Sequence, residues 1–319
     1  MDSIPVQSKP SEEPAESPHS VGPLRPPRGI GRTEIGLHFL LFLLIAFVIG
    51  PAFVGGVAVI LLGLPVGTVT PEFLLFIEAG NFAILLGLTA AISLLEERPF
   101  GDYGLPLKEA FARKFWIGIL LGLLEVTLVV GLIFISGGYS FGNLELHREE
   151  IFRSGLLHLV LFLLVGLYEE LLFRGYLQVR LSKWVGFWPA AILLSVGFGV
   201  EHLHNQGEGL VGALSVALVG LLFAFTLRRT GSLWYAVGLH ASFDWGETFL
   251  FSVPNSGIVV QGHLSNAVLH GPKWLTGASV GPEGSVFCFL TMGLQFLVVM
   301  WLFPKRAAQQ TAELAAVTK

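Results

Sequence analysis

The sequence predicts an all-α polytopic membrane protein, a bundle of about eight transmembrane helices. Of its 319 residues, 53% are hydrophobic and only 13% are charged, whereas about a quarter of a soluble globular protein is charged. The mean hydropathy of +0.71 points the same way. Long apolar segments recur along the chain, and each is close to the roughly 20 residues that a helix needs to cross a bilayer. The lipid bilayer is therefore the expected surroundings of most of the chain.

Eight apolar segments are the candidate spans. They are residues 36–63, 71–94, 115–136, 156–183, 188–204, 210–228, 232–252 and 285–303. The first segment is interrupted at Gly50-Pro51. In the third, Gly118 and Gly122 lie one helical turn apart, which predicts a notch where another helix can approach closely.

The basic residues indicate how these segments cross the membrane. With a cytoplasmic N-terminus, 16 of the 19 Lys and Arg residues fall on the inner side of the eight-span layout. Short cytoplasmic loops of membrane proteins carry an excess of Lys and Arg. The sequence therefore predicts an integral, multi-pass membrane protein with both termini in the cytoplasm.

The chain divides into three regions. Residues 1–33 are rich in Pro, Ser and charge and lack aromatics, so we expect a disordered tail and not a signal peptide. Residues 34–305 form the membrane domain, and residues 306–319 form a cytoplasmic C-terminal tail. The single cysteine, Cys288, excludes an intrachain disulfide and is expected to be buried. The net charge of −4 gives no electrostatic reason to expect a nucleic-acid partner.

Ionisable and amide side chains inside the predicted spans call for a functional explanation. Each charge at the bilayer centre costs about 2.5–3.5 kcal/mol on insertion scales. The candidates are Glu78, Asn81, Glu125, Glu169, Glu170, Arg174, Glu201, His202, His240, Asp244 and Glu247.

The densest of these groups is the stretch GLYEELLFRG at residues 166–175. Glu170 and Arg174 are four residues apart, so they lie on one face of a helix and can form an ion pair. Glu169 is rotated away from that face and is left to interact with something else. If the motif has no function, it is an interfacial charge pair at the end of a helix.

Two histidines and an aspartate on later spans are the candidate partners of Glu169. If the turn after the fourth span lies between Lys183 and Trp188, Glu169 and His202 are both about 21 Å from it along neighbouring helices. His240 and Asp244 are four residues apart on the seventh span, so the aspartate can fix the tautomer of the imidazole, or both can face one cavity. His240 is expected nearer the basic end of its own helix, at a depth of about 12 Å.

Two chemistries suit these four side chains. In one, Glu169 and His202 hold and deprotonate a water that attacks a peptide carbonyl, while His240 and Asp244 stabilise the oxyanion or orient the substrate. In the other, Glu169, His202 and His240 bind zinc and leave one coordination position open for a water. Both chemistries place hydrolysis by an activated water within the membrane.

Three motifs now stand in order: EELLFR at 169–174, FGVEH at 198–202 and HASFD at 240–244. Together they resemble the CPBP family of CAAX proteases and bacteriocin-processing enzymes, also called the ABI family, which includes the type II CAAX prenyl endopeptidase. The resemblance is strong over about 156–250. It implies an eight-helix membrane bundle with an active site inside the membrane. It also implies an endopeptidase whose substrate is a membrane-associated protein or peptide, lipidated or cut near its C-terminus.

The family pattern also implies roles by position. Glu169 is then the base, and His202 binds the water. Glu170 and Arg174 are the supporting pair, while His240 and Asp244 supply the oxyanion side. Asp244 stands where the family pattern commonly has Asn, and a carboxylate donates a hydrogen bond only when protonated. That difference favours a role for Asp244 in orienting His240 or in binding a metal.

Other polar features have simpler explanations. GYSFG (138–142) and GASVG (277–281) match a nucleophile-elbow pattern by chance, and the absence of HExxH excludes a zinc site on a single helix. Glu78, Asn81 and Glu125 are expected to satisfy one another or to line the cavity. The loop 253–284 is expected to form an interfacial lid without a chemical role. The alternative to an enzyme is a transporter or immunity-type scaffold that uses the same polar residues as an ion or proton site.

Overall fold

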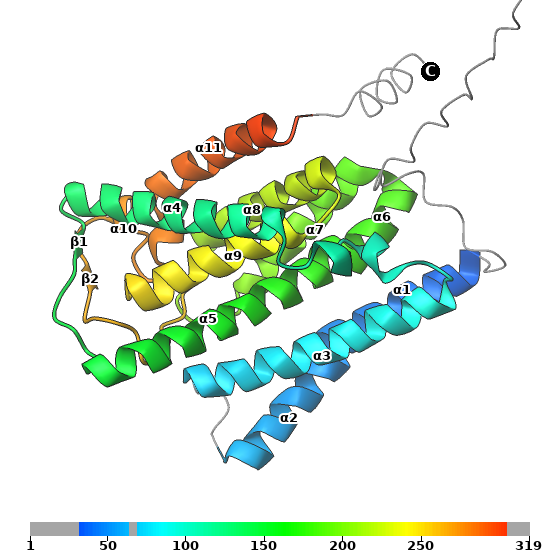
Figure 1. Cartoon of the computed structure of the whole chain (residues 1–319), viewed down its shortest axis with the longest axis horizontal. Helices are drawn as coiled ribbons and strands as arrows, with labels where there is room; N and C mark the ends of the chain where they lie inside the picture. Colours follow the sequence, from blue (N-terminus) through cyan, green and yellow to red (C-terminus); the bar gives the residue numbers. More distant parts are fainter. Residues whose placement is uncertain (1–31, 64–68, 305–319) are drawn as a thin grey trace, which may run out of the picture.

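The computed structural model describes residues 32–63 and 69–304 (Figure 1). The predicted tails, 1–33 and 306–319, lie outside the described residues except for Arg32 and Thr33 at the start of the first helix. The α-helices are α1 (Arg32–Leu44), α2 (Gly50–Leu62), α3 (Pro71–Leu95), α4 (Arg113–Ile135), α5 (Arg148–Glu170), α6 (Gln178–Val185), α7 (Phe187–His202), α8 (Leu210–Thr230), α9 (Trp234–Trp245), α10 (Lys273–Thr276) and α11 (Val286–Leu302).

Short elements interrupt or join these helices. Three π-helical segments continue α-helices: η1 (Ile45–Ile49), η4 (Leu171–Leu177) and η5 (Gly246–Leu250). Three 3₁₀ turns lie in loops: η2 (Phe100–Tyr103), η3 (Leu107–Glu109) and η6 (Pro282–Gly284). Strands β1 (Tyr139–Ser140) and β2 (Val268–Leu269) pair antiparallel at one end of the bundle (Figure 1).

The prediction of an all-α membrane protein is confirmed. Every predicted span contains a helix, and five helices among the described residues are long and apolar enough to cross a membrane. The count of eight spans is not confirmed, because the fifth, seventh and eighth segments form the shorter helices α7, α9 and α11. The first span is not broken at Gly50-Pro51: the helix runs on through the π-helical segment η1.

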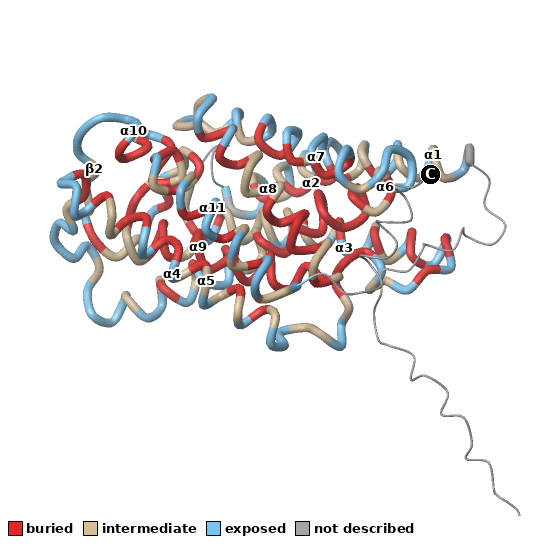
Figure 2. The backbone as a smooth tube through the Cα atoms, turned by 90° about the horizontal axis from the view of Figure 1, so that it is seen from above, coloured by how far each residue is buried: buried red, intermediate tan, exposed pale blue. Residues whose placement is uncertain are grey.

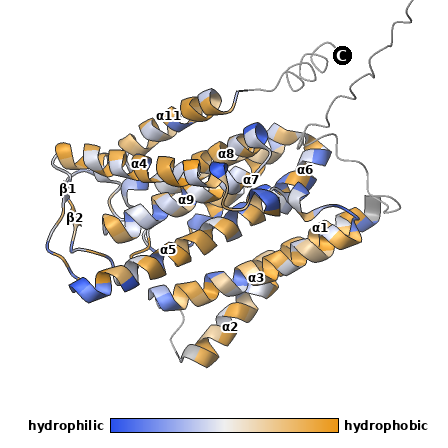
Figure 3. Cartoon of the chain, in the orientation of Figure 1, coloured by the Kyte–Doolittle hydropathy of each residue, from blue (hydrophilic) through white to orange (hydrophobic). Residues whose placement is uncertain are grey.

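Helix α9 is the centre of the bundle. Nearly all of its residues are buried. The outer helices expose large apolar side chains such as Leu37 and Ile60. Exposed stretches of the backbone are drawn in pale blue in Figure 2, and the hydrophobic stretches of the helices in orange in Figure 3. Apolar side chains on the outer surface are what a bilayer favours. The side chains of α9, and therefore His240 and Asp244, are held inside the protein.

Close packing of α4 on α9 depends on glycine. A Cβ atom at Gly118 or Gly122 would collide with the backbone oxygens of Tyr235 and Leu239 on α9. Gly238 on α9 lies equally close to the backbone of α4 at Phe115. The predicted notch at Gly118 and Gly122 is therefore confirmed, and α9 is the helix that fills it.

A buried ion pair joins the end of α3 to the helix that carries the double-acid motif. Glu96, fully buried, pairs with Arg180 of α6 and accepts a hydrogen bond of 2.6 Å from the Tyr103 hydroxyl. Breaking a buried pair by removing one partner leaves an uncompensated charge. This contact therefore holds α6, and with it the end of the motif helix, against α3.

Candidate active site

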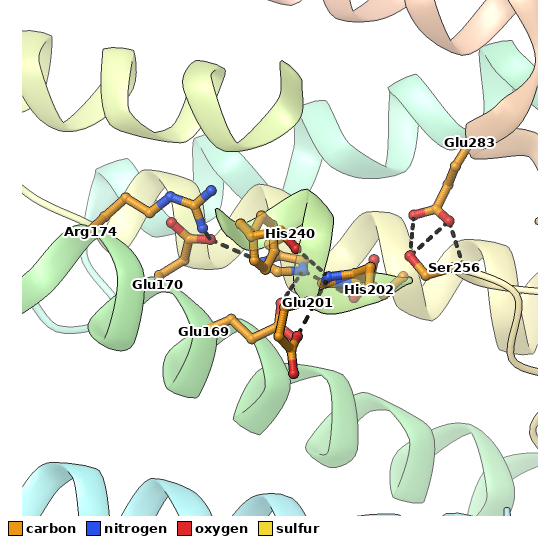
Figure 4. A network of polar contacts seen from close by, with 10 residues as sticks. Glu169, Glu170, Arg174, Glu201, His202, His240, Ser256 and Glu283 are labelled. Carbon is orange, nitrogen blue, oxygen red and sulfur yellow. Dashed lines mark hydrogen bonds and ion pairs between the residues drawn. The ribbon is translucent and has the colours of Figure 1, made fainter. Parts of the chain in front are cut away.

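The double-acid motif lies where a regular helix becomes π-helical. Glu169 and Glu170 end α5, and Arg174 lies within η4, beside a break in helical backbone angles at Gly175. Such π-helical turns are frequent at functional sites. Arg174 Nη1 donates to Glu170 Oε1 at 3.2 Å, and the two side chains are 1% and 0% exposed (Figure 4). The ion pair expected from the spacing is confirmed.

Aromatic rings hold Arg174 from the other side. Its guanidinium carbon lies 4.3 Å from the ring centroid of Phe198 on α7 and 5.5 Å from that of Phe223 on α8. A Cβ atom at Gly220 on α8 would overlap Arg174 Nη2. Phe198, the first residue of the second motif, therefore packs on Arg174, the last residue of the first motif. Gly220 has no side chain and leaves space for the guanidinium.

His240 is the point where three carboxylates meet. Its Nδ1 lies 3.2 Å from Glu170 Oε1. Its Nε2 lies 3.5 Å from Glu169 Oε2 and 3.4 Å from Asp244 Oδ2 (Figure 4 shows His240 beside both glutamates). Because a carboxylate only accepts, Nδ1 carries the proton toward Glu170. The tautomer is thus set by Glu170 from α5, and Asp244 faces the other nitrogen.

The structure closes the gap in depth that the residue count left between His240 and Glu169. Contact with Glu169 puts the two side chains at the same level, although the residue count along each helix placed them at different depths. That count assumed one straight α-helix with a constant rise from the turn. The motif helix is instead π-helical over η4 and breaks at Gly175, so its rise is not uniform.

His202 ends α7 and is held by its own helix. Its Nδ1 lies 2.9 Å from the Phe198 carbonyl oxygen, and its ring meets the Phe198 ring edge-on with centroids 4.6 Å apart. Since a carbonyl accepts, Nδ1 donates and Nε2 is left with its lone pair. Glu169 and His202 line the same cavity, but the imidazole in contact with Glu169 is His240.

A cavity of about 370 Å³ lies between these helices. Glu169, His202, His240 and Asp244 all line it, as do Glu78 and Asn81 from α3, Glu125 from α4 and Glu201 from α7. Glu170 and Arg174 are not among the described residues that line it. The structure therefore separates the two acids as expected: Glu169 reaches the cavity, and Glu170 lies behind it in an ion pair.

The loop 253–284 contributes to the cavity wall through Asn255, Ser256 and Glu283, which sequence reasoning did not assign. Glu283 Oε2 accepts hydrogen bonds from the Ser256 backbone N–H at 2.5 Å and from its hydroxyl at 3.0 Å (Figure 4). Burial, together with the nearby Asp244 carboxylate, raises the pKa of Glu283 to about 8. The loop has no periodic pattern, so only its packing shows that it reaches the site.

The two serine motifs lie away from the cavity. Ser140, in β1, forms a 2.9 Å hydrogen bond with His270 Nε2, and Ser279 donates to the Gly207 carbonyl at 2.9 Å. Neither serine is among the described residues that line the cavity. His204 is exposed and lies 2.9 Å from the Glu201 carbonyl oxygen.

The predicted zinc ligands do not form a metal centre in this arrangement. No three His, Cys, Asp or Glu side chains of the described residues converge closely enough to hold a metal ion. Glu169 and Asp244 both meet the Nε2 atom through which His240 would bind zinc. Zinc binding by Glu169, His202 and His240 stays a prediction.

Comparison with known proteins identifies the central part of the chain. Residues 151–246 match the family model described as type II CAAX prenyl endopeptidase Rce1-like. A search of curated proteins and a search of solved structures each found no match. The matched segment contains all three motifs, which confirms the resemblance inferred from them. Residues 151–246 are thus similar to the Rce1-like family of CAAX proteases, a family of membrane endopeptidases that act on proteins or peptides.

Proposed function

We propose that this protein is an intramembrane endopeptidase that hydrolyses a peptide bond of a membrane-associated protein or peptide with an activated water. One observation carries the proposal. Glu169, His202 and His240 come from three different helices and line one cavity, while the buried Glu170–Arg174 pair lies behind them. A carboxylate and two imidazoles around a cavity are the groups that general acid–base hydrolysis uses.

In the first step, Glu169 takes a proton from a water in the cavity. Its Oε2 atom is buried and accepts no hydrogen bond, so it is free to act as the base. The lone pair on His202 Nε2 accepts the second water proton in a hydrogen bond and orients the oxygen. The hydroxide then attacks the substrate carbonyl carbon and forms a tetrahedral oxyanion.

In the second step, His240 stabilises the oxyanion and Glu169 completes the reaction. Glu170 holds Nδ1 of His240, so its other nitrogen is aimed at the cavity and, when protonated, donates to the oxyanion. As the C–N bond breaks, Glu169 returns its proton to the leaving amine. Water has then been divided between the two products, and the enzyme is regenerated.

Asp244 differs from the amide that the family pattern commonly has at this position. An ionised carboxylate cannot donate to an oxyanion. Its Oδ2 lies 3.4 Å from His240 Nε2, so its role in this proposal is to orient the imidazole. Asp244→Asn should therefore retain part of the activity, because an amide can orient the ring or donate directly.

The substrate class follows from the apolar residues that line the cavity. Phe47, Leu74, Phe162 and Leu172 line it, from the first helix, α3, α5 and η4. An apolar wall that leads to carboxylates suits a peptide carrying a lipid group or an apolar C-terminal segment. The proposal therefore includes cleavage of a lipidated protein or cleavage near its C-terminus.

The experiment compares cells that express the wild type with cells that express Glu169→Ala, His202→Ala or His240→Ala. Proteomics of membrane-protein C-termini should show products that only the wild type forms, with all variants inserted at equal levels. Undiminished cleavage by Glu169→Ala would refute the mechanism. Ion flux into proteoliposomes without proteolysis would favour the transporter alternative. Loss of cleavage on chelation, with recovery on adding zinc, would support the predicted zinc site.

A further inference from the structure

The described residues that line the cavity carry an unbalanced charge. Six of them are carboxylates: Glu78, Glu125, Glu169, Glu201, Asp244 and Glu283. None of the described lining residues is Lys or Arg. A cleft lined by one sign of charge concentrates ligands of the opposite sign. The lining therefore disfavours an anionic group and favours a cationic one.

Three of these carboxylates have partners at one end of the cavity. Asp244 meets His240, and Glu283 accepts two hydrogen bonds from Ser256. Glu125 interacts with the side chains of Gln295 and Thr291 on α11. At this end of the cavity, the acids therefore already interact with other side chains of the protein.

The wall formed by α3 is different. Asn81 lines the cavity and is only 9% exposed, and its side-chain oxygen has no hydrogen-bond partner. One turn earlier, the buried Oε2 atom of Glu78 also has no partner. Both atoms are acceptors, and a buried acceptor without a donor is unfavourable. The wall therefore calls for a ligand that brings N–H donors.

Glu201 completes this wall from α7. It lines the same cavity and lies close enough to Glu78 for the two charges to interact, as does Glu169. The Glu201 side chain is 55% exposed, so it stands where the cavity opens. Glu78 and Asn81 lie outside the segment 151–246 that matches the family, whereas Glu201 lies inside it.

We propose that Glu78, Asn81 and Glu201 form a subsite that binds a Lys or Arg side chain of the substrate, next to the bond that Glu169 attacks. The inference rests on the proposed endopeptidase function and adds a substrate preference to it. An ammonium or guanidinium group supplies several N–H donors and a positive charge at once. Among the described residues, no three His, Cys, Asp or Glu side chains are close enough together to hold a metal ion. An ammonium or guanidinium group is larger than a metal ion and can bridge acceptors that lie further apart.

The test uses membrane-attached reporter peptides that differ at one residue. Lys, norleucine or Glu is placed in turn at each of the two positions on either side of the scissile bond. The wild type should cleave the Lys peptide with a kcat/KM about tenfold above the norleucine peptide, as expected for one charge-assisted hydrogen bond. The Glu peptide should be the poorest substrate.

Variants locate the preference. Glu78→Gln should reduce the Lys-to-norleucine ratio toward one, and Glu78→Lys should make the Glu peptide the better substrate. Glu201→Gln should reduce the ratio as well, and the fold should stay intact because the Glu201 side chain is exposed. Glu72→Gln removes a charge from the exposed first turn of the same helix and is the matched control, which should keep the wild-type ratio.

The outcomes separate this inference from the function on which it rests. Equal cleavage of all three peptides by the wild type would overturn the subsite and leave the endopeptidase intact. A Lys preference that survives in both Glu78→Gln and Glu201→Gln would also overturn it. If the wild type cleaves no peptide of the series while natural membrane proteins remain uncut, the proposed function itself fails.

Discussion

The two adjacent carboxylates of the motif should respond to substitution in opposite ways. Glu169→Gln removes the proposed base but no hydrogen bond, because its Oε2 atom lies 3.5 Å from His240 Nε2 without a hydrogen bond. Loss of a general base lowers kcat by about 10²- to 10⁴-fold. The thermal stability of the variant should stay at the wild-type level or rise, since a buried carboxyl becomes a neutral amide.

Glu170→Gln should instead destabilise the fold. It leaves the guanidinium of Arg174, which is 1% exposed, without its counter-ion. Removing one partner of a buried ion pair costs about 3–5 kcal/mol. The same change weakens the acceptor for His240 Nδ1, so activity should fall together with stability.

A double variant separates these two effects. Glu170→Leu/Arg174→Met replaces the whole pair by apolar side chains, which is often neutral for stability. It should therefore recover most of the stability that Glu170→Gln loses. It should remain poorly active, because His240 still lacks a partner at Nδ1.

The assay pairs turnover of a membrane-attached reporter peptide with thermal unfolding in detergent, for all variants at equal expression. Full activity in Glu169→Gln would refute its role as the base. Unchanged stability in Glu170→Gln would contradict the buried ion pair. Restored activity in the double variant would show that Glu170 does not orient His240.

Three further predictions test the packing around the site and the protonation of Glu283. Gly220→Ala should lower activity and cost about 1–3 kcal/mol of stability, because its Cβ would overlap Arg174; Gly197→Ala on α7, where nothing lies within 4 Å, is the control and should be neutral in the same unfolding assay. Gly118→Val should separate α4 from α9 and abolish both folding and cleavage, measured by detergent gel filtration and turnover. Burial raises the pKa of Glu283 from 4.5 to about 8, so the folded state binds this proton more tightly than the unfolded state. The stabilisation that comes from protonated Glu283 is thus complete below about pH 4.5 and is lost as pH rises to about 8. Glu283→Gln should flatten that decline in melting temperature, and an unchanged slope would contradict the assignment.

The sequence by itself determined the features that depend on local geometry and on solvent. Composition and apolar segment length identified a helical membrane protein, because a bilayer admits few other structures. The pairing of Glu170 with Arg174 followed from a separation of four residues, which places two side chains on one helix face whatever the rest of the chain does. The three motifs then identified the family from residues in a single stretch.

Only the tertiary structure decided which partners meet across the bundle. Glu170 contacts Nδ1 of His240 across 70 positions of sequence. Asp244 contacts the other ring nitrogen, Nε2, and so does not fix the proton on Nδ1. These contacts depend on how closely α9 packs and on the break at Gly175, and neither follows from counting residues along straight helices. The cavity walls from α3 and from the loop at Glu283 are also tertiary features. Side chains so far apart in sequence come together only through the packing of whole elements, and no local periodicity encodes that packing.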